Sequence, residues 1–231
     1  MNIALILSGG TGSRLGGNVP KQYVELNGRA VISYCLNTVL EMAEIDAVVI
    51  VAASQWQDYI KDQIKDLPDS GISVSFAEPG DTRQLSILNG LREMSTFSQS
   101  EDKVIIHDAA RPLVSANLIR ELLEVLDEHE AVMPVLPMKD TVYLGKEGRI
   151  EAMLERKHVL AGQAPEGFLF GKYIKACESL LPDEILRING STEPALLAGM
   201  DVVYIDGEES NFKITTPADF KRFKAIIEGG K

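Results

Sequence analysis

The feature that most constrains this chain is a short apolar run at its N-terminus that leads directly into a glycine-rich segment. Residues 3–7 are Ile-Ala-Leu-Ile-Leu, and the glycine segment, residues 8–17, is Ser-Gly-Gly-Thr-Gly-Ser-Arg-Leu-Gly-Gly. A continuous apolar run that stops at glycines predicts a strand buried on both faces of a parallel sheet. The glycines let the backbone approach a ligand closely and point several amides at one anion. This combination is typical of the phosphate sites of α/β proteins.

Two cations strengthen the phosphate interpretation. Arg14 lies within the glycine segment, and Lys21 follows it in the sequence Pro-Lys-Gln-Tyr. Both side chains carry a full charge, which backbone dipoles alone do not supply. The alternative, a tight strand-to-helix turn with incidental charges, would be a fair interpretation of the glycines by themselves. The cations make it the weaker one.

Two well-known phosphate loops do not fit this segment. A P-loop requires Gly-x-x-x-x-Gly-Lys-Ser/Thr, and the chain contains no such string. The dinucleotide fingerprint Gly-x-Gly-x-x-Gly nearly fits from Gly10, but Leu15 replaces its third glycine. That fingerprint also needs an acidic residue after the second strand, whereas residues 52–55 are Ala-Ala-Ser-Gln. A nicotinamide-dependent dehydrogenase is therefore disfavoured.

Apolar strands alternate with amphipathic helices along most of the chain, which predicts a mostly parallel, Rossmann-like α/β sheet in a single domain over residues 1–231. Ligands bind such sheets at the carboxyl ends of the strands, where the glycine segment, Gly80 and Asp108 all fall. Ser54, Ser115 and Thr216 are expected to cap helices. The expected strands are 3–7, 47–51, 71–76, 103–107, 131–137 and 202–205; the expected helices are 30–40, from 54, 86–94, 115–128, 170–181, 194–198 and from 217.

One segment breaks this rhythm. Residues 140–144 and 149–153 flank Gly-Lys-Glu-Gly, which predicts a β-hairpin. We expect it to form an arm over about residues 138–158 that projects from the sheet. An isolated two-stranded hairpin is marginally stable in water, so the arm should find a partner surface.

The composition narrows the class of protein. A net charge of −11 without a long basic stripe disfavours a nucleic-acid binder. No apolar run approaches the ~20 residues that cross a bilayer, and the N-terminus lacks a signal-peptide pattern. Cys35 and Cys177 lie in helical patterns and are expected to be buried thiols in a reducing compartment. We therefore expect a cytoplasmic protein without a membrane or nucleic-acid partner.

Beyond the glycine segment and Pro-Lys-Gln-Tyr, further blocks complete a family resemblance. Together they resemble the glycosyltransferase-A-like nucleotidyltransferases, and within them the cytidylyltransferases for methylerythritol 4-phosphate and ribitol 5-phosphate. The blocks follow the family's order over nearly the whole chain. They are Gly80-Asp81-Thr82-Arg83-Gln84-Leu85-Ser86, His107-Asp108-Ala109-Ala110-Arg111-Pro112, Asp140-Thr141, Gly162-Gln163-Ala164-Pro165 and Asn211-Phe212-Lys213-Ile214-Thr215.

The resemblance implies a reaction and a set of residue roles. A phosphate oxygen of a polyol phosphate attacks the α-phosphorus of CTP, with Mg²⁺ as cofactor, in a homodimer whose arms pair. His107 is expected to pack or cap rather than catalyse, and a helix cap is the alternative for Ser86. The implied catalytic residues are Arg14, Lys21 and Lys213; the nucleotide contacts are Ser8, Gly9, Gly10, Thr11, Gly12, Gly80, Asp81, Arg83 and Ser86; the acceptor contacts are Arg111, Thr141 and Arg156; and the Mg²⁺ ligand is Asp108.

Two departures from the family pattern concern the acceptor. Ala164 stands where the relatives carry Thr before Pro, and residues 189–194 lack the relatives' Asp, which leaves Thr192 or Glu193 as candidates. Gly162-Gln163 before Ala164 resembles the ribitol-type enzymes more. The alternatives that stay open are a transferase for another nucleotide or sugar phosphate and a non-catalytic nucleotide-binding relative.

Overall fold

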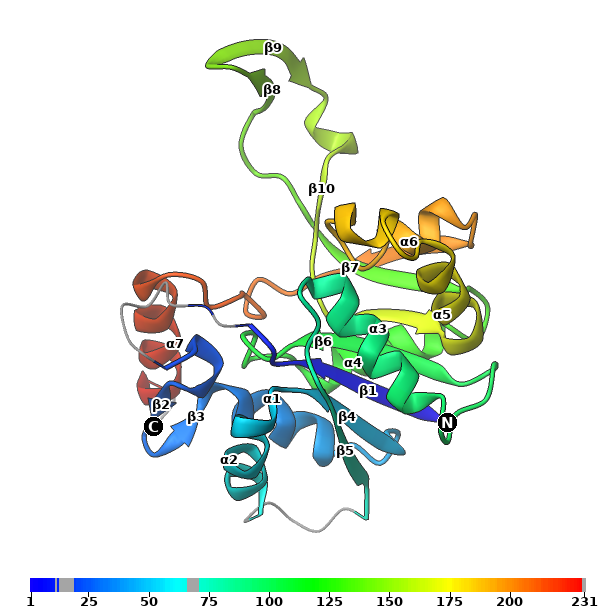
Figure 1. The fold of residues 1–231 in the computed structure, drawn as a ribbon. Coiled ribbons are helices and arrows are strands. Elements are labelled where there is room, and N and C mark those ends of the chain that lie inside the picture. The colour runs from blue at the N-terminus through cyan, green and yellow to red at the C-terminus, as the bar shows by residue number, and fades with distance from the viewer. Residues whose placement is uncertain (11, 13–18, 66–70, 230–231) are drawn as a thin grey trace.

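The computed structural model describes residues 1–10, 12, 19–65 and 71–229. Its centre is a parallel sheet in the order β6-β1-β4-β5. The strands are β1 (Asn2–Leu7), β4 (Ala47–Val51), β5 (Ser73–Ala77) and β6 (Lys103–Asp108). All four were predicted, and their order brings the loops after β1, β5 and β6 to one edge of the sheet (Figure 1).

Beyond β6 the sheet becomes mixed. β11 (Glu166–Leu169) runs antiparallel between β6 and β7 (Ala131–Pro137), and β10 (Leu160–Gly162) pairs antiparallel with the end of β7. β12 (Val202–Asp206) pairs parallel with β7 on its other side. The mostly parallel α/β fold is thus confirmed, with β10 and β11 as antiparallel strands that the sequence pattern did not predict.

Helices cover both faces of the sheet (Figure 1). β1 alternates between two cores: Ala4 and Ile6 pack into one cluster, Ile3 and Leu5 into the other. The first cluster includes residues of α1 and α4, and the second includes residues of α3 and α5. The helices are α1 (Val31–Leu40), α2 (Ser54–Ile64), α3 (Arg83–Met94), α4 (Ala116–Val125), α5 (Phe170–Ser179), α6 (Glu193–Leu197) and α7 (Pro217–Gly229).

Two helix caps are confirmed. The Ser115 hydroxyl accepts the amide of Leu118 at 3.0 Å at the start of α4. The Thr216 hydroxyl accepts the amide of Asp219 at 3.3 Å, and the Asp219 carboxylate accepts the amide of Thr216 in return at 2.8 Å. This reciprocal pair satisfies the free amides at the start of α7, where Pro217 takes the first helical position.

Two other expectations about helix starts are wrong. Ser54 does not cap α2, because it is the first residue of the helix and its hydroxyl donates to Glu78 at 2.5 Å. The helix expected from Ser86 begins three residues earlier, at Arg83, and Thr82 caps it by accepting the amide of Leu85. Ser86 therefore lies inside the helix, and its hydroxyl is available for other contacts.

The predicted arm is present. β8 (Val142–Lys146) and β9 (Arg149–Leu154) form an antiparallel hairpin, which extends away from the sheet in Figure 1. Its turn has φ 50° at Glu147 and 77° at Gly148, the left-handed conformations that a tight hairpin turn needs. Tyr143, Ile150 and Met153 are 52%, 70% and 69% exposed, so the hairpin leaves apolar surface open in the single chain.

The remaining elements are short. β2 (Glu25–Leu26) and β3 (Arg29–Ala30) form a small hairpin before α1, and single turns of 3₁₀ helix cover Lys21–Tyr23, Arg156–His158 and Glu184–Arg187. Within the described residues, every helix is too short or too polar to span a membrane.

Candidate active site

A pocket of about 760 Å³ lies at the carboxyl ends of β1, β5 and β6. Four motifs that are far apart in the sequence line it together. Gly9, Gly10 and Gly12 come from the loop after β1, with Lys21 beside them. The other predicted residues that line it are Gly80, Asp81, Arg83, Ser86, Asp108 and Lys213. Arg14 and Thr11 lie outside the described residues.

The glycine loop is held from behind by the residues after Lys21. The side-chain amide of Gln22 donates to the carbonyls of Ser8 and Gly10, both at 2.7 Å. The hydroxyls of Ser8 and Tyr23 are hydrogen-bonded at 2.9 Å, and Tyr23 also donates to the Ser8 carbonyl. Ser8 is only 2% exposed, so this predicted nucleotide contact lies behind the loop, where its hydroxyl is used internally.

The second loop of the pocket is held by Ser86. Its hydroxyl accepts the amide of Gly80 at 3.0 Å and lies 2.9 Å from the carbonyl of Thr82. The two loops also touch closely, since a Cβ added at Gly9 would lie 2.4 Å from the Cβ of Pro79. Ser86 thus shapes the loop that lines the pocket beside it.

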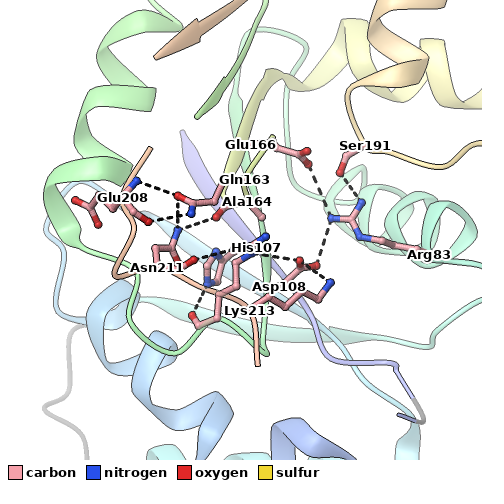
Figure 2. A network of polar contacts seen from close by, with 11 residues as sticks. Arg83, His107, Asp108, Gln163, Ala164, Glu166, Ser191, Glu208, Asn211 and Lys213 are labelled. Atoms are coloured by element: carbon pink, nitrogen blue, oxygen red, sulfur yellow. Dashed lines mark hydrogen bonds and ion pairs between the residues drawn. The ribbon is translucent and has the colours of Figure 1, made fainter. Parts of the chain in front are cut away.

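Asp108 is the centre of charge in the site (Figure 2). Lys213 Nζ lies 2.9 Å from its Oδ2, Arg83 Nη2 lies 3.3 Å from Oδ1, and Arg111 Nε lies 3.6 Å from Oδ2. Burial raises the pKa of Asp108, but the charges of Arg83, Lys213 and Arg111 outweigh burial and hold this pKa well below its usual value. The carboxylate is therefore ionised at any physiological pH. Two of the three cations that meet at it, Arg83 and Lys213, come from distant parts of the chain.

Arg83 has two further partners that the sequence did not reveal. Its Nη1 donates to the Ser191 hydroxyl at 2.5 Å, and its Nη2 lies 3.9 Å from Glu166 Oε2. Burial raises the pKa of Glu166, which is 8% exposed. Neither residue is among the predicted site residues. The pairing of β11 with β6 brings Glu166 to Arg83, and the loop before α6 brings Ser191 to it.

His107 and the two cysteines behave as expected. His107 is buried, and its Nε2 donates to the carbonyl of Arg111 at 2.9 Å. Burial lowers the pKa of His107 to about 4, so the ring is neutral at physiological pH. Cys35 and Cys177 are buried free thiols, and burial raises the pKa of each to about 12. The buried thiols fit a packing role.

A second pocket, of about 410 Å³, lies on the other side of Lys213. Arg111 and Lys213 line it together with Arg222, whose guanidinium stacks 4.1 Å over the ring of Phe212. Lys213 therefore borders both pockets, whereas Arg111 faces the smaller one. Both pockets are thus lined by cationic side chains, so each can bind an anionic group, with Lys213 next to both groups.

The predicted arm contacts Arg156 and Thr141 line neither pocket within one chain. Arg156 is exposed, and its Nη1 donates to the carbonyl of Lys139 at 2.5 Å. Thr141 is also exposed, just before β8. Of the cations that the family resemblance implies, Lys21 and Arg83 line the large pocket, Arg111 lines the smaller one and Lys213 lines both. Arg156 of the same chain lines neither.

The described residues contain no cluster of three or more His, Cys, Asp and Glu side chains that could hold a metal ion. The large pocket presents one buried carboxylate, Asp108, next to its glycine loop. A single carboxylate suits Mg²⁺, which takes one or two carboxylates and completes its shell with substrate phosphates.

Curated relatives match the chain along its whole length. It is 33% identical to a 2-C-methyl-D-erythritol 4-phosphate cytidylyltransferase of Thermotoga neapolitana, over 99% of this chain and 97% of the relative. It is 32% identical to a ribitol-5-phosphate cytidylyltransferase of Vibrio parahaemolyticus, over 99% and 96%. It is also 32% identical to a bifunctional IspD/IspF enzyme of Paramagnetospirillum magneticum, over 98% of this chain and 57% of the relative. The chain thus spans little more than half of the bifunctional relative.

Comparison with solved structures finds the same group of enzymes. A crystal structure of 4-diphosphocytidyl-2C-methyl-D-erythritol synthase from Anaerococcus prevotii superposes with a TM-score of 0.84 at 26% identity, over 98% of this chain and 96% of the other. The family model described as IspD, 2-C-methyl-D-erythritol 4-phosphate cytidylyltransferase, matches residues 2–229. The chain that places Lys21, Asp108 and Lys213 around one pocket therefore belongs to the IspD family of cytidylyltransferases.

Proposed function

We propose that this chain transfers the cytidylyl group of CTP to a polyol phosphate, 2-C-methyl-D-erythritol 4-phosphate or D-ribitol 5-phosphate, and releases pyrophosphate. The observation that carries the proposal is the large pocket in which Lys21, the glycine loop and Lys213 face one another beside Asp108. The names of the relatives support cytidylyl transfer and leave both acceptors open.

The proposed reaction needs positioning more than acid–base chemistry. The acceptor's phosphate monoester has a second pKa of about 6, so it is already largely dianionic near neutral pH. Its oxygen forms a bond to the α-phosphorus of CTP while the bond from that phosphorus to the pyrophosphate oxygen breaks. The protein must therefore hold two polyanions in line and stabilise the charge of the transferring group. The neutral, buried His107 fits this scheme, since no general base is required.

Each cation has a place in this scheme. The glycine loop cradles the triphosphate, and Lys21 and Arg14 stabilise charge at the α-phosphate. Lys213 borders both pockets, so it can contact the α-phosphate and the acceptor phosphate together. Arg111 faces the smaller pocket and binds the acceptor's phosphate group. Gly80, Asp81 and Ser86 form the wall that reads the base or the ribose.

We propose Mg²⁺ as the cofactor, held by Asp108 and by phosphate oxygens of CTP. When bound, it neutralises negative charge on the triphosphate. Asp108 fits this role because a carboxylate offers about four lone-pair positions. Lys213 and Arg83 contact one oxygen each, and Arg111 lies farther away. Asp108 therefore keeps lone pairs for a metal ion while its cationic neighbours hold its orientation.

We propose a homodimer in which the arms pair and each arm reaches its partner's acceptor pocket. The exposed apolar side chains of β8 and β9, Tyr143, Ile150 and Met153, support this pairing, since a hairpin alone does not bury them. Arg156 and Thr141 lie on the arm and line neither pocket of their own chain. In the dimer they would complete the acceptor site in trans.

A mixing experiment tests the arm. Lys21→Ala subunits and Arg156→Ala subunits are each inactive in this scheme. Mixed dimers contain one site with both native residues, so the mixture should regain up to about a quarter of native activity if subunits exchange at random. Mixed subunits without recovered activity, or a fully active monomer by light scattering, would contradict the arrangement.

The test of the proposed function is a panel of CTP, UTP, ATP and GTP, each with both polyol phosphates and a sugar 1-phosphate. Pyrophosphate release should require CTP and one polyol phosphate. A preference for UTP would identify a transferase for another nucleotide. Nucleotide binding that raises the Tm without any turnover would identify a non-catalytic relative. The acceptor, the cytoplasmic location and the absence of nucleic-acid and membrane partners stay predictions.

A further inference from the structure

Lys213 lies on a segment that has no helix or strand to hold it. Residues 207–216 connect β12 to α7 as turns and irregular backbone. A lysine has a flexible four-carbon stem, yet a catalytic group must stay within about 0.5 Å of its productive position. Other parts of the chain must therefore fix the backbone from which Lys213 extends.

Gln163 provides one of these contacts. Its Nε2 donates to the carbonyl of Glu208 at 2.9 Å, and its Oε1 accepts the amide of Glu208 at 3.1 Å. The side-chain amide thus pairs with this backbone as a neighbouring strand would. Gln163 is 4% exposed, and its own amide donates to the carbonyl of Pro134 in β7 at 2.8 Å. The contact therefore connects the segment to the central sheet (Figure 2).

Asn211 provides the second contact. It is fully buried, and its Nδ2 donates to the carbonyl of Ala164 at 2.8 Å and lies 3.3 Å from Gln163 Oε1. Its own carbonyl accepts Arg111 Nη1 at 2.7 Å. Asn211 therefore links the strand region that carries Gln163 to a cation of the smaller pocket.

Lys213 follows two residues later and is anchored on its other side. The amide of Ile214 donates to the carbonyl of Ala110 at 2.8 Å. The backbone of Lys213 is thus enclosed between the anchored residues Asn211 and Ile214. Its Nζ lies 2.9 Å from Asp108 Oδ2.

We propose that Gln163 and Asn211 are positioning residues for Lys213, and that their hydrogen-bonded pair, the Gln163–Asn211 clamp, sets where the Lys213 ammonium lies between the two pockets. This inference rests on the proposed function for the role of Lys213 in turnover. It also gives a physical reason for two motifs, Gly162-Gln163-Ala164-Pro165 and Asn211-Phe212-Lys213. Their first polar residues do not line the large pocket, and Gln163 lines the smaller one.

The first experiment replaces Gln163 by Met, which keeps the length of the side chain and removes both polar atoms. The backbone of Glu208 then loses two partly buried hydrogen bonds, and the segment is free to shift. A displacement of about 1 Å of a reacting group costs roughly 10²-fold in rate, so kcat should fall by about 10- to 100-fold. The KM for CTP should change little, because the rest of the large pocket is unaltered. Asn211→Ala should give the same pattern.

A double-mutant cycle separates positioning from general damage. If the clamp acts through Lys213, Gln163→Met should lower kcat by less than about 2-fold when Lys213 is already Ala. An equal loss in both backgrounds, or no loss with Lys213 present, would overturn the proposal. Two control variants keep the comparison matched. Ser210→Ala changes an exposed residue of the same segment, and Gln63→Met removes a side-chain acceptor of the Ala30 amide elsewhere in the fold.

Hydrogen–deuterium exchange tests the Gln163–Asn211 clamp without an activity measurement. The peptide covering residues 207–214 should exchange faster in Gln163→Met than in the wild type, and Ser210→Ala and Gln63→Met should match the wild type in this peptide. Unchanged exchange in Gln163→Met would show that the segment is held by other contacts and would overturn the clamp. Absence of wild-type activity would contradict the proposed function instead, and the exchange result would still stand.

Discussion

The contact between Gly9 and Pro79 predicts how the two loops of the large pocket depend on each other. A Cβ at Gly9 would lie 2.4 Å from Pro79 Cβ and 3.3 Å from its Cγ. Ordinary carbon–carbon contacts are about 3.5–4.0 Å, so the loops would have to separate by about 1 Å. The proline ring cannot rotate away. Gly9→Ala therefore tests whether the spacing of these loops matters for binding and turnover.

The expected cost has two parts. Overpacking of this size destabilises a fold by about 1–3 kcal/mol. For a chain of this length that lowers the Tm by roughly 2–12 °C. A shift of about 1 Å in the phosphate loop also costs roughly 10²-fold in kcat/KM, because the triphosphate would no longer be in line with the acceptor.

Calorimetry and steady-state pyrophosphate release measure these two effects. Gly10→Ala is the control for stability and Gly190→Ala the control for activity, because a Cβ at either glycine would meet nothing within 4 Å. The Tm of Gly10→Ala should stay within about 2 °C of the wild type. If Gly9→Ala matched its controls in both assays, the two loops would not be in the contact described.

Three further predictions concern charge. Lys21→Ala and Arg14→Ala should each lower kcat by orders of magnitude, roughly 10²- to 10³-fold, with an unchanged Tm, and near-normal rates in either variant would remove that residue from the site. Asp108→Asn should shift the Mg²⁺ titration of activity to higher concentration, whereas an unchanged titration would show that Asp108 is no ligand. The folded pKa of His107 is about 4, below its ordinary 6.5, so the unfolded chain binds more protons between these values. The free energy of unfolding should thus fall as pH drops from 6.5 to 4, by up to roughly 3 kcal/mol from this group. His107→Gln should flatten that part of the pH profile, and an equally steep profile would refute the assignment.

The sequence predicted the parts of the fold that local patterns encode. The apolar runs of β1, β4 and β6 and the amphipathic faces of α1 and α4 have a clear period, and their alternation implies a parallel sheet. The common position of the loops that we propose to bind phosphate follows from this, since the carboxyl ends of parallel strands share one edge of the sheet. The hairpin was predictable because its turn needs Gly148 and a second residue with positive φ.

The sequence did not predict contacts that depend on long-range pairing. β10 and β11 are short, and only their pairing with β7 and β6 makes them strands. That pairing places Glu166 near Arg83 and lets Gln163 hold Glu208. A polar residue in such a strand looks like a loop residue until its partner across the sheet is known.

Two local predictions about helix starts failed. Ser54 is the first residue of α2 and donates to Glu78 instead of capping the helix. Thr82 caps α3, so Ser86 lies inside that helix and holds Gly80. Both positions have the residue type that a cap prefers. The choice between a cap and a tertiary contact depends on how close the neighbouring loop comes, which the local sequence does not specify.

If Lys21, Lys213 and Asp108 promote attack on the α-phosphorus of CTP, the products that receive the individual phosphorus atoms of CTP are determined, and ³²P labels can follow them. With α-³²P-CTP and the acceptor, the label should appear in the CDP-polyol, and with γ-³²P-CTP it should appear in pyrophosphate. The α-³²P label in free CMP would indicate hydrolysis of CTP. A polyol bisphosphate labelled from the γ-position would indicate a kinase. Either result would contradict the proposed cytidylyl transfer.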